Sequence, residues 1–258
     1  MSAVVLESHG ARIGVRAPAS LLDLVVEQAT AFARVTGPGA LDAEVAVTSL
    51  RERRWSVTSS CIVEPVMCEG SDPLVAHQVL DHLHPLFARH ARRVLFVHAG
   101  AFKLDGALVV VPGRSHSGKS TLVSEALDRG ATYYSDEFAV IGPHGFVHPY
   151  PRPLSLRRAG HASRRFSATE LGGRVATAPA RATFVISTRY RESATWNPEL
   201  VTGARAALPV IANTLRARTA PGPTTRMAAQ LARQAITLVG ERGEAADLLD
   251  SLRRRSRP

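Results

Sequence analysis

The chain has 258 residues, of which 45% are hydrophobic, and its 32 Lys and Arg against 22 Asp and Glu give a formal net charge of +10. This length and composition predict a real hydrophobic core, in one large domain or a main domain with a smaller partner. No apolar run approaches the roughly 18 residues of a membrane span, and residues 1–7 lack the features of a signal peptide. Cys61 and Cys68 show no metal-ligand spacing. The sequence therefore predicts a reduced, cytoplasmic protein without a membrane partner.

The positive charge admits an acidic partner, such as an acidic peptide or a nucleic acid. Most arginines are dispersed, but two clusters stand out, at Arg157, Arg158, Arg164 and Arg165 and at residues 253–257. Few aromatic residues accompany them, which argues against a nucleic-acid platform. A solvated surface is the preferred interpretation of both clusters, and residues 253–258 are predicted to form a disordered basic tail.

Residues 1–92 are predicted to form a small α+β region. The alternation of apolar and polar residues over 11–16 is typical of a strand, and residues 44–48 and 55–58 have the same character. A helix is predicted from about Ser71 to His90, with apolar residues on one face.

Four histidines of that helix, His77, His82, His84 and His90, raise the question of a metal site. Zinc needs convergent ligands, for instance two histidines four residues apart with a third ligand elsewhere. The pairs His77/His82 and His82/His84 lack this spacing, so we expect surface or partly packed histidines and no zinc.

The pattern changes after residue 93. A buried strand is predicted at 94–97, and two strands flank Asp105-Gly106, a strong hairpin signal. The second of these strands, 107–111, leads into Gly113–Ser120, which reads G-x-x-x-x-G-K-S. A helical segment follows from Thr121. Strand, glycine-rich turn and helix form the context that a phosphate-binding P-loop requires.

A P-loop presents successive backbone N–H groups to phosphates at a helix N-terminus. The nucleotide-binding residues predicted here are Gly113, Arg114, Ser115, His116, Ser117, Gly118, Lys119, Ser120 and Thr121. Lys119 should reach the β- and γ-phosphates, and the Ser120 hydroxyl should bind Mg²⁺. Lys103 and Lys119 are the only lysines. An arginine-rich chain thus places a lysine where a compact ammonium suits phosphate oxygens. The predicted cofactors are ATP (or GTP) and Mg²⁺.

The remaining sequence completes an α/β domain with a mixed sheet. Ser135-Asp136-Glu137 precedes an apolar strand, and a mobile loop with short elements is expected over 155–182. Later elements are predicted as a strand at 183–187, helices near 199–218 and 223–233, a strand at 236–239 and a helix at 244–249. The predicted domains are residues 1–92, 93–252 and the tail 253–258.

The stretch 94–158 resembles the catalytic domain of the HPr serine kinase/phosphorylase family. It is most similar to HPr-kinase-related proteins of biosynthetic clusters, including those that phosphorylate ribosomally made lasso-type peptides. The likeness is carried by His98-Ala99-Gly100, the hairpin, the G-x-x-x-x-G-K-S loop, Ser135-Asp136-Glu137 and Pro149–Arg157.

This resemblance implies that Asp136 is the catalytic base and that His98 lies near the reacting phosphate. The predicted catalytic residues are Asp136, His98 and Lys119. The resemblance also implies that Glu137, with Ser120, helps to hold the metal. The loop residues 114–117 are bulkier than is usual in the family, which puts nucleotide preference in doubt. The C-terminal signature that docks HPr is not found, so neither HPr as substrate nor a phosphorylase activity is expected.

The chemistry is coherent without the family. One carboxylate can take the acceptor's proton while its neighbour organises the metal. Adjacent residues of a strand point to opposite faces, so Asp136 and Glu137 are not both expected to face the phosphate. Arg152 and Arg157 are candidates for stabilising transition-state charge, with surface or substrate-docking roles as alternatives.

Three functions stay open. The first is an ATP-dependent kinase that phosphorylates a hydroxyl, in particular serine in a peptide or protein such as a ribosomally made precursor peptide. The second is a small-molecule kinase acting on an amino acid or sugar alcohol. The third is a nucleotide-binding recognition or scaffold subunit that delivers a peptide to a partner enzyme. The sequence does not decide between ATP and GTP, nor whether the chain forms a homo-oligomer.

Overall fold

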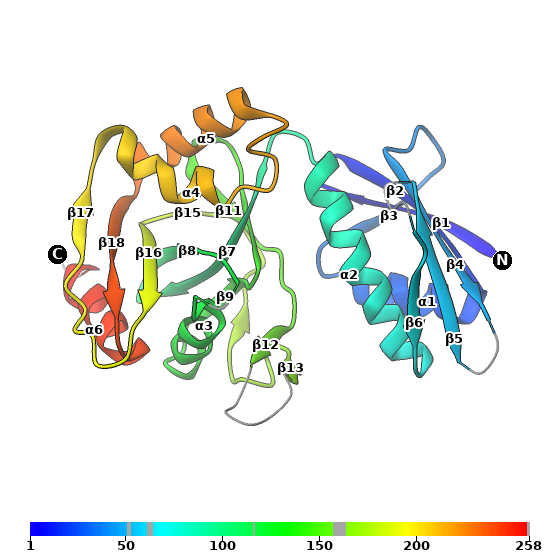
Figure 1. Cartoon of the computed structure of the whole chain (residues 1–258), viewed down its shortest axis with the longest axis horizontal. Helices are drawn as coiled ribbons and strands as arrows, with labels where there is room; N and C mark the ends of the chain where they lie inside the picture. Colours follow the sequence, from blue (N-terminus) through cyan, green and yellow to red (C-terminus); the bar gives the residue numbers. More distant parts are fainter. Residues whose placement is uncertain (51–52, 61–63, 116, 157–163, 257–258) are drawn as a thin grey trace. The chain divides into compact units, whose positions relative to one another are not determined.

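The computed structural model describes residues 1–50, 53–60, 64–115, 117–156 and 164–256. The chain divides into two compact units, Met1–Arg93 and Val94–Pro258. The fold class is α/β with mixed sheets, as predicted (Figure 1). Over the described ranges, none of the helices combines the length and apolar character needed to cross a membrane.

The first unit is a six-stranded sheet covered by two helices. Its elements are β1 (Ser2–Ser8), β2 (Ala11–Ala17), α1 (Ala19–Ala29), β3 (Arg34–Thr36), β4 (Ala43–Ser49), β5 (Arg54–Ser59), β6 (Val66–Glu69) and α2 (Asp72–His90). The strand order is β3-β1-β2-β4-β5-β6, with β2 and β4 parallel. Ile13, Val15, Val45 and Val47 are fully buried at alternate positions of two strands. This period of two gives the sheet one apolar face, against which the helices pack.

The second unit is built on a ten-stranded mixed sheet with the path β15-β11-β10-β7-β8-β16-β18-β17. Off this path, β9 pairs with β7, and β14 pairs with β9. Its strands are β7 (Leu95–Leu104), β8 (Ala107–Pro112), β9 (Thr132–Ser135), β10 (Phe138–Ile141), β11 (Phe146–His148), β14 (Arg174–Val175), β15 (Ala180–Arg181), β16 (Phe184–Tyr190), β17 (Glu199–Val201) and β18 (Ile236–Arg242). Its helices are α3 (Lys119–Asp128), α4 (Leu208–Ala212), α5 (Pro221–Gln234) and α6 (Ala245–Ser256), and β12 (Leu154–Leu156) pairs with β13 (Arg164–Phe166).

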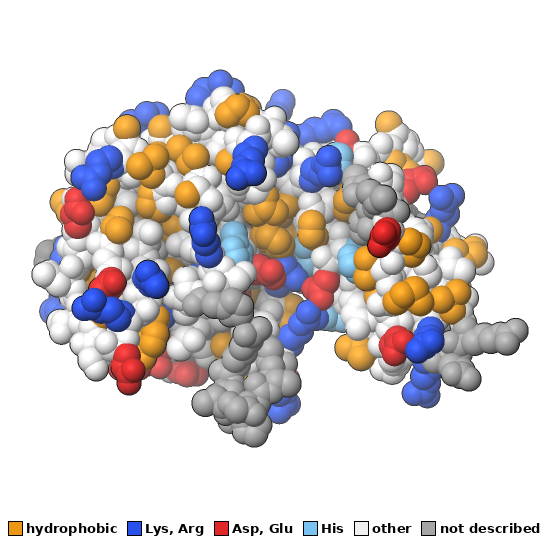
Figure 2. Space-filling view, viewed as in Figure 1, with side chains coloured by type: hydrophobic (Ala, Val, Ile, Leu, Met, Phe, Trp, Pro, Cys, Tyr) orange, Lys and Arg blue, Asp and Glu red, His pale blue; other side chains and the backbone are white. Residues whose placement is uncertain are grey.

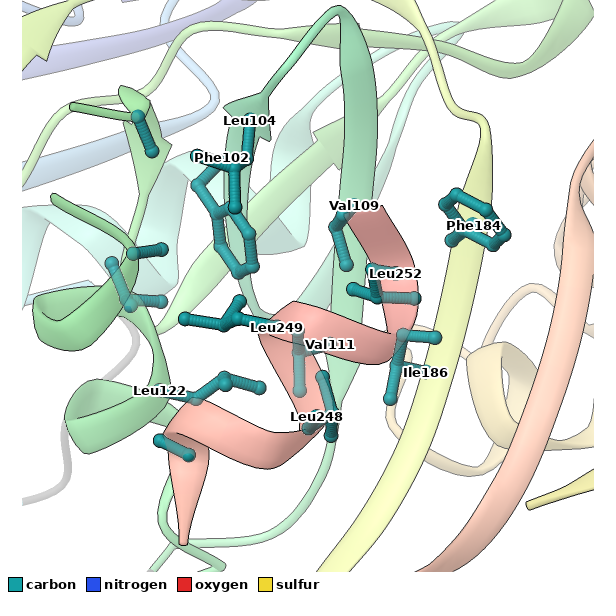
Figure 3. Close-up of a cluster of buried hydrophobic side chains, with 14 of the residues drawn as sticks. Phe102, Leu104, Val109, Val111, Leu122, Phe184, Ile186, Leu248, Leu249 and Leu252 are labelled. Carbon is teal, nitrogen blue, oxygen red and sulfur yellow. The ribbon is translucent and has the colours of Figure 1, made fainter. Parts of the chain in front are cut away.

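The second unit has three layers because its central strands are apolar on both faces. In β8, Val109 and Val111 pack with α3 and α6 on one face, where Figure 3 shows the cluster closed by Leu122 and Leu249. Leu108 and Val110 face the opposite layer, which contains residues of α4 and α5. Continuous apolar runs are typical of strands covered on both sides. This arrangement leaves the strand ends and their connecting loops as the polar edges of the sheet.

A substitution at Leu249 measures how much the packing of α6 against this core contributes to the stability of the fold. The Leu249 side chain is fully buried, so Leu249→Ala should lower the free energy of unfolding by about 2–5 kcal/mol through lost burial and the remaining cavity. The matched control is Leu200→Ala, because Leu200 is 59% exposed and should cost far less. Chemical denaturation followed by tryptophan fluorescence and circular dichroism measures both. Equal losses for the two variants would contradict the packing of α6.

The hairpin prediction is confirmed, and two other expectations are corrected. Asp105 and Gly106 both have positive φ (49° and 83°) between antiparallel β7 and β8, as a type I′ turn requires. The predicted helix near 199–218 is wrong at its start, because Glu199–Val201 pairs with β18 as an edge strand. The stretch 155–182 contains short paired strands in its described part, in agreement with the short elements predicted there.

The predicted disordered tail is also wrong as far as Ser256, because α6 continues to that residue. Leu252 is 3% exposed within the core, and the Arg253 Nε atom pairs with Asp105 Oδ2 at 2.6 Å. Arginines in the last turn also interact favourably with the helix dipole. Burial of one face therefore orders a segment whose composition is typical of disorder, while residues 257–258 lie outside the described part.

Candidate functional site

The loop Gly113–Gly118 joins β8 to α3, in the strand–loop–helix order that the sequence predicts. Strands β8, β16 and β18 are parallel neighbours, so their carboxyl ends lie on one edge of the sheet. The loop leaves from this edge, which is where ligands bind in open α/β sheets. Gly118 has a φ of +83° and caps the N-terminus of α3, a conformation that favours glycine.

Lys119 lies inside the loop rather than in solvent. It is 7% exposed, and its Nζ atom donates to the carbonyl oxygens of Gly113 at 2.7 Å and Arg114 at 2.8 Å. Burial lowers its pKa, and the nearby carboxylates of Asp136 and Glu137 oppose this shift. The loop thus carries a buried ammonium whose present partners are neutral carbonyl groups.

Asp136 faces the first turn of α3. Its Oδ2 atom accepts a 2.6 Å hydrogen bond from the Ser120 hydroxyl, and the residue is 5% exposed. Burial raises its pKa, while the Ser120 hydrogen bond and the charges of Lys119 and Arg152 oppose the rise. The other carboxylate oxygen, Oδ1, is buried without a hydrogen-bond partner among the described residues. A buried oxygen of this kind is costly unless it binds something.

Glu137 pairs with an arginine beside the site. It has a φ of +84°, is half-exposed, and its Oε2 atom pairs with Arg152 Nη1 at 2.6 Å. The Arg152 guanidinium also lies over the Phe138 ring, 5.2 Å from its centre. Ser120 is therefore brought together with Asp136, whereas Glu137, the carboxylate predicted to share the metal with Ser120, pairs with an arginine.

His98 belongs to β7 and lies next to Gly113, the first residue of the loop. Its backbone carbonyl accepts a hydrogen bond from the Gly113 N–H at 3.1 Å, and its own N–H donates to the Asn213 carbonyl at 2.7 Å. Burial, together with the charge of Lys119, lowers the pKa of the imidazole from its ordinary 6.5 to about 4. The ring is therefore neutral at physiological pH and can serve as a hydrogen-bonding group, not as a cation.

This lowered pKa predicts a pH dependence. Between pH 6.5 and 4 the unfolded chain binds a proton at this histidine that the folded chain does not, so the His98 contribution to stability falls as pH falls through that window. NMR titration of the His98 ring protons should give a midpoint near pH 4. His98→Gln should flatten the decline of the unfolding free energy between pH 6.5 and 4. A midpoint near 6.5 would contradict the burial of this ring next to Lys119.

The other predicted loop residues differ in their exposure to solvent. Arg114, Ser115 and Thr121 are exposed, while the Ser117 hydroxyl is buried without a partner in the described part of the chain. The predicted site residue His116 lies outside the described residues. So does Arg157, the second candidate for stabilising transition-state charge.

The structure also brings in Arg242, which the sequence analysis did not find. Arg242 ends β18 and donates through Nη2 to the Gly118 carbonyl at 2.8 Å. The two residues are 124 positions apart, and no local motif marks the arginine. Only the parallel pairing of β16 with both β8 and β18 could have indicated that β18 ends beside the loop.

A magnesium ion fits this donor set better than a metal that needs several protein ligands. Among the described residues, no group of three or more His, Cys, Asp and Glu side chains could hold a metal. Mg²⁺ retains several waters and needs only one or two protein oxygens besides phosphate. The Ser120 hydroxyl and the Asp136 carboxylate, with its unpartnered Oδ1, supply oxygens of this kind.

Comparisons with known proteins give matches among solved structures only. The chain matches no known protein family and no curated protein sequence. Among solved structures it is similar to the Hpr(Ser) kinase/phosphatase from Coxiella burnetii, with a TM-score of 0.35 and 17% identity over 62% of this chain and 93% of that one. A likeness at this level is too weak to carry a functional argument, so function has to be inferred from the residues of the site.

Proposed function

We propose that this protein is an ATP- and Mg²⁺-dependent phosphotransferase that phosphorylates a hydroxyl, in particular serine in a peptide or protein. The observation that carries the proposal is the 2.6 Å contact between Ser120 and the buried carboxylate of Asp136, directly beside Lys119 at the head of α3. A hydroxyl, a carboxylate and an ammonium at the end of a G-x-x-x-x-G-K-S loop are the groups that phosphoryl transfer uses to bind phosphate and metal.

The phosphates would bind where the loop meets α3. The first turn of a helix has backbone N–H groups without partners inside the helix, and these suit anions. Lys119 now donates to two loop carbonyls, which phosphate oxygens can replace with a stronger, charge-assisted interaction. We therefore assign Gly113–Thr121 to the nucleotide phosphates.

We assign Mg²⁺ to Ser120 and Asp136, in place of the pair Ser120 and Glu137 that the sequence predicts. When bound, the ion would neutralise charge on the transferring phosphate. The Asp136 carboxylate has two oxygens, of which one is already engaged by Ser120 and one is unpartnered. We retain Asp136 as the group that takes the acceptor's proton, because its buried and unpartnered Oδ1 atom can accept a hydrogen bond from the acceptor hydroxyl.

The charge distribution favours an acidic acceptor. Residues 94–258 contain 23 Lys and Arg against 12 Asp and Glu, a net of +11, whereas residues 1–93 contain 9 against 10, a net of −1. A general enrichment in arginine would raise the net charge of both units. The excess positive charge therefore belongs to the unit that contains the site. Figure 2 shows Lys and Arg side chains spread over the visible face of that unit. We infer that acidic residues flank the acceptor serine, because such a surface attracts acidic segments.

Transfer of labelled γ-phosphate tests the proposal. The protein is incubated with Mg²⁺ and γ-labelled ATP or GTP, and with a library of serine peptides that differ in the charge of the flanking residues. We expect labelled phosphoserine, with acidic peptides preferred. Free serine and sugar alcohols serve as small-molecule acceptors. Label on these alone would favour the small-molecule kinase, and absence of any labelled product would contradict the proposed transfer.

A further inference from the structure

Arg242 is a buried cation that forms no salt bridge with any described residue, although the charge of Glu244 acts on it. It is 2% exposed and donates through Nη1 to the Gly243 carbonyl at 2.9 Å and through Nη2 to the Gly118 carbonyl at 2.8 Å. Its guanidinium lies 5.7 Å from the centre of the Tyr190 ring. Within the described ranges Arg242 forms no ion pair, and its Nε atom is buried without a hydrogen-bond partner.

Such an arrangement is costly for a purely structural residue. A buried charge loses its hydration, and two carbonyl dipoles and one aromatic face replace only part of it. Burial accordingly lowers the pKa of Arg242. A long apolar side chain in this place would avoid the cost, so the arginine calls for an explanation that includes an anion.

The contact with Gly118 places this cation directly behind the loop. The Gly118 carbonyl belongs to the peptide that continues into Lys119, and a trans peptide is planar with its C=O and N–H pointing in opposite directions. The Gly118 oxygen also accepts a hydrogen bond from the Leu122 N–H at 3.1 Å, so α3 and Arg242 together hold it on one side. The Lys119 N–H is then directed to the other side. A side chain at position 118 would collide with the Arg242 guanidinium, so glycine and arginine fit each other here.

We propose that Arg242 is a positioning residue for the nucleotide phosphates, resting on the function proposed above. Together with the first hydrogen bond of α3, it fixes the Gly118–Lys119 peptide so that the Lys119 N–H faces the bound phosphates. Those phosphates in turn supply, across that peptide, further negative charge for a guanidinium that Glu244 compensates only in part. Nucleotide affinity would then depend on a residue that does not touch the nucleotide.

Two variants separate the charge from the shape of the side chain. Arg242→Met should weaken Mg-ADP binding at least about tenfold, while the melting temperature without nucleotide stays the same or rises, because an incompletely compensated buried charge is removed. Arg242→Lys keeps the positive charge but lacks the planar guanidinium with its several N–H donors, and should give an intermediate affinity. Arg191→Met is the control, since Arg191 lies at the same sheet edge but is 69% exposed and pairs with Glu241. Isothermal titration calorimetry and thermal melts give these values.

The unmodified protein provides a second test that does not depend on a variant folding. Addition of Mg-ADP should shift the NMR resonance of the Arg242 Nε–H group and slow its exchange with water. An unchanged resonance in a protein that binds Mg-ADP would overturn the role of Arg242 and leave the proposed function intact. A wild-type affinity of Arg242→Met for Mg-ADP would also overturn the role of Arg242 and leave the proposed function intact. A wild-type protein that does not bind Mg-ADP or Mg-ATP would contradict the proposed function, and this role with it.

Discussion

Asp136→Asn should lower the rate of phosphoryl transfer by about 10³-fold or more and leave the affinity for the nucleotide within a few-fold of the wild-type value. Asparagine has the same shape and can still accept the Ser120 hydrogen bond, so the loop and α3 should keep their structure. It removes the negative charge that we assign to the metal and to the acceptor's proton. Single-turnover transfer of labelled phosphate to the preferred serine peptide measures the rate.

Glu137→Gln is the matched control, because Glu137 is the next residue and carries the same kind of charge. Its side chain pairs with Arg152, so we expect a loss of no more than about tenfold. The positive φ of Glu137 is retained by glutamine, which keeps the backbone comparable. If Glu137→Gln abolished transfer and Asp136→Asn did not, the metal and base would belong to Glu137, as the sequence alone suggested for the metal.

Lys119→Ala should raise the Kd for Mg-ATP by about 100-fold, which corresponds to ~2.7 kcal/mol. The ammonium is the one buried cation inside the described part of the loop, and alanine also leaves the carbonyls of Gly113 and Arg114 without their present donor. Lys103→Ala is a natural control, since these two are the only lysines in the chain. Titration with a fluorescent ATP analogue measures both variants.

An unchanged Kd in Lys119→Ala would contradict the phosphate assignment of the loop. Peptide binding without phosphoryl transfer would instead favour the recognition or scaffold function. In that case an acidic peptide would bind tightly to the wild type, to Lys119→Ala and to Asp136→Asn alike, and none of the three would release phosphorylated product. The same protein samples can therefore distinguish an enzyme from a binding subunit.

The loop and its strand and helix could be predicted from sequence because their information is local. Glycine at position 118, the apolar run before Gly113 and the Asp105-Gly106 turn each restrict the backbone through their own chemistry. The class of fold followed from the alternation of such segments along the second unit. Short-range rules of this kind are independent of the partner that a segment meets.

The rest depends on contacts between distant residues. The positive φ of Glu137, a non-glycine residue, is signalled by no sequence pattern. Glu199–Val201 has no strand pattern of its own and is a strand because β18 lies beside it. Nothing in the sequence distinguishes Arg242 from the other arginines, because its place beside Gly118 results from the pairing of distant parallel strands.

The contact between Gly118 and Arg242 also has a consequence for synthesis of the protein. Its two residues are 124 positions apart, so the ribosome must add all of the intervening chain after the loop has been made. At about 5–20 residues per second, this takes roughly 6 to 25 s. During that interval the first unit, residues 1–93, already has its whole sequence available for folding. During this time the nascent chain carries the loop Gly113–Gly118 without its contact to Arg242, and ribosome profiling of bound chaperones would test whether they recognise this state.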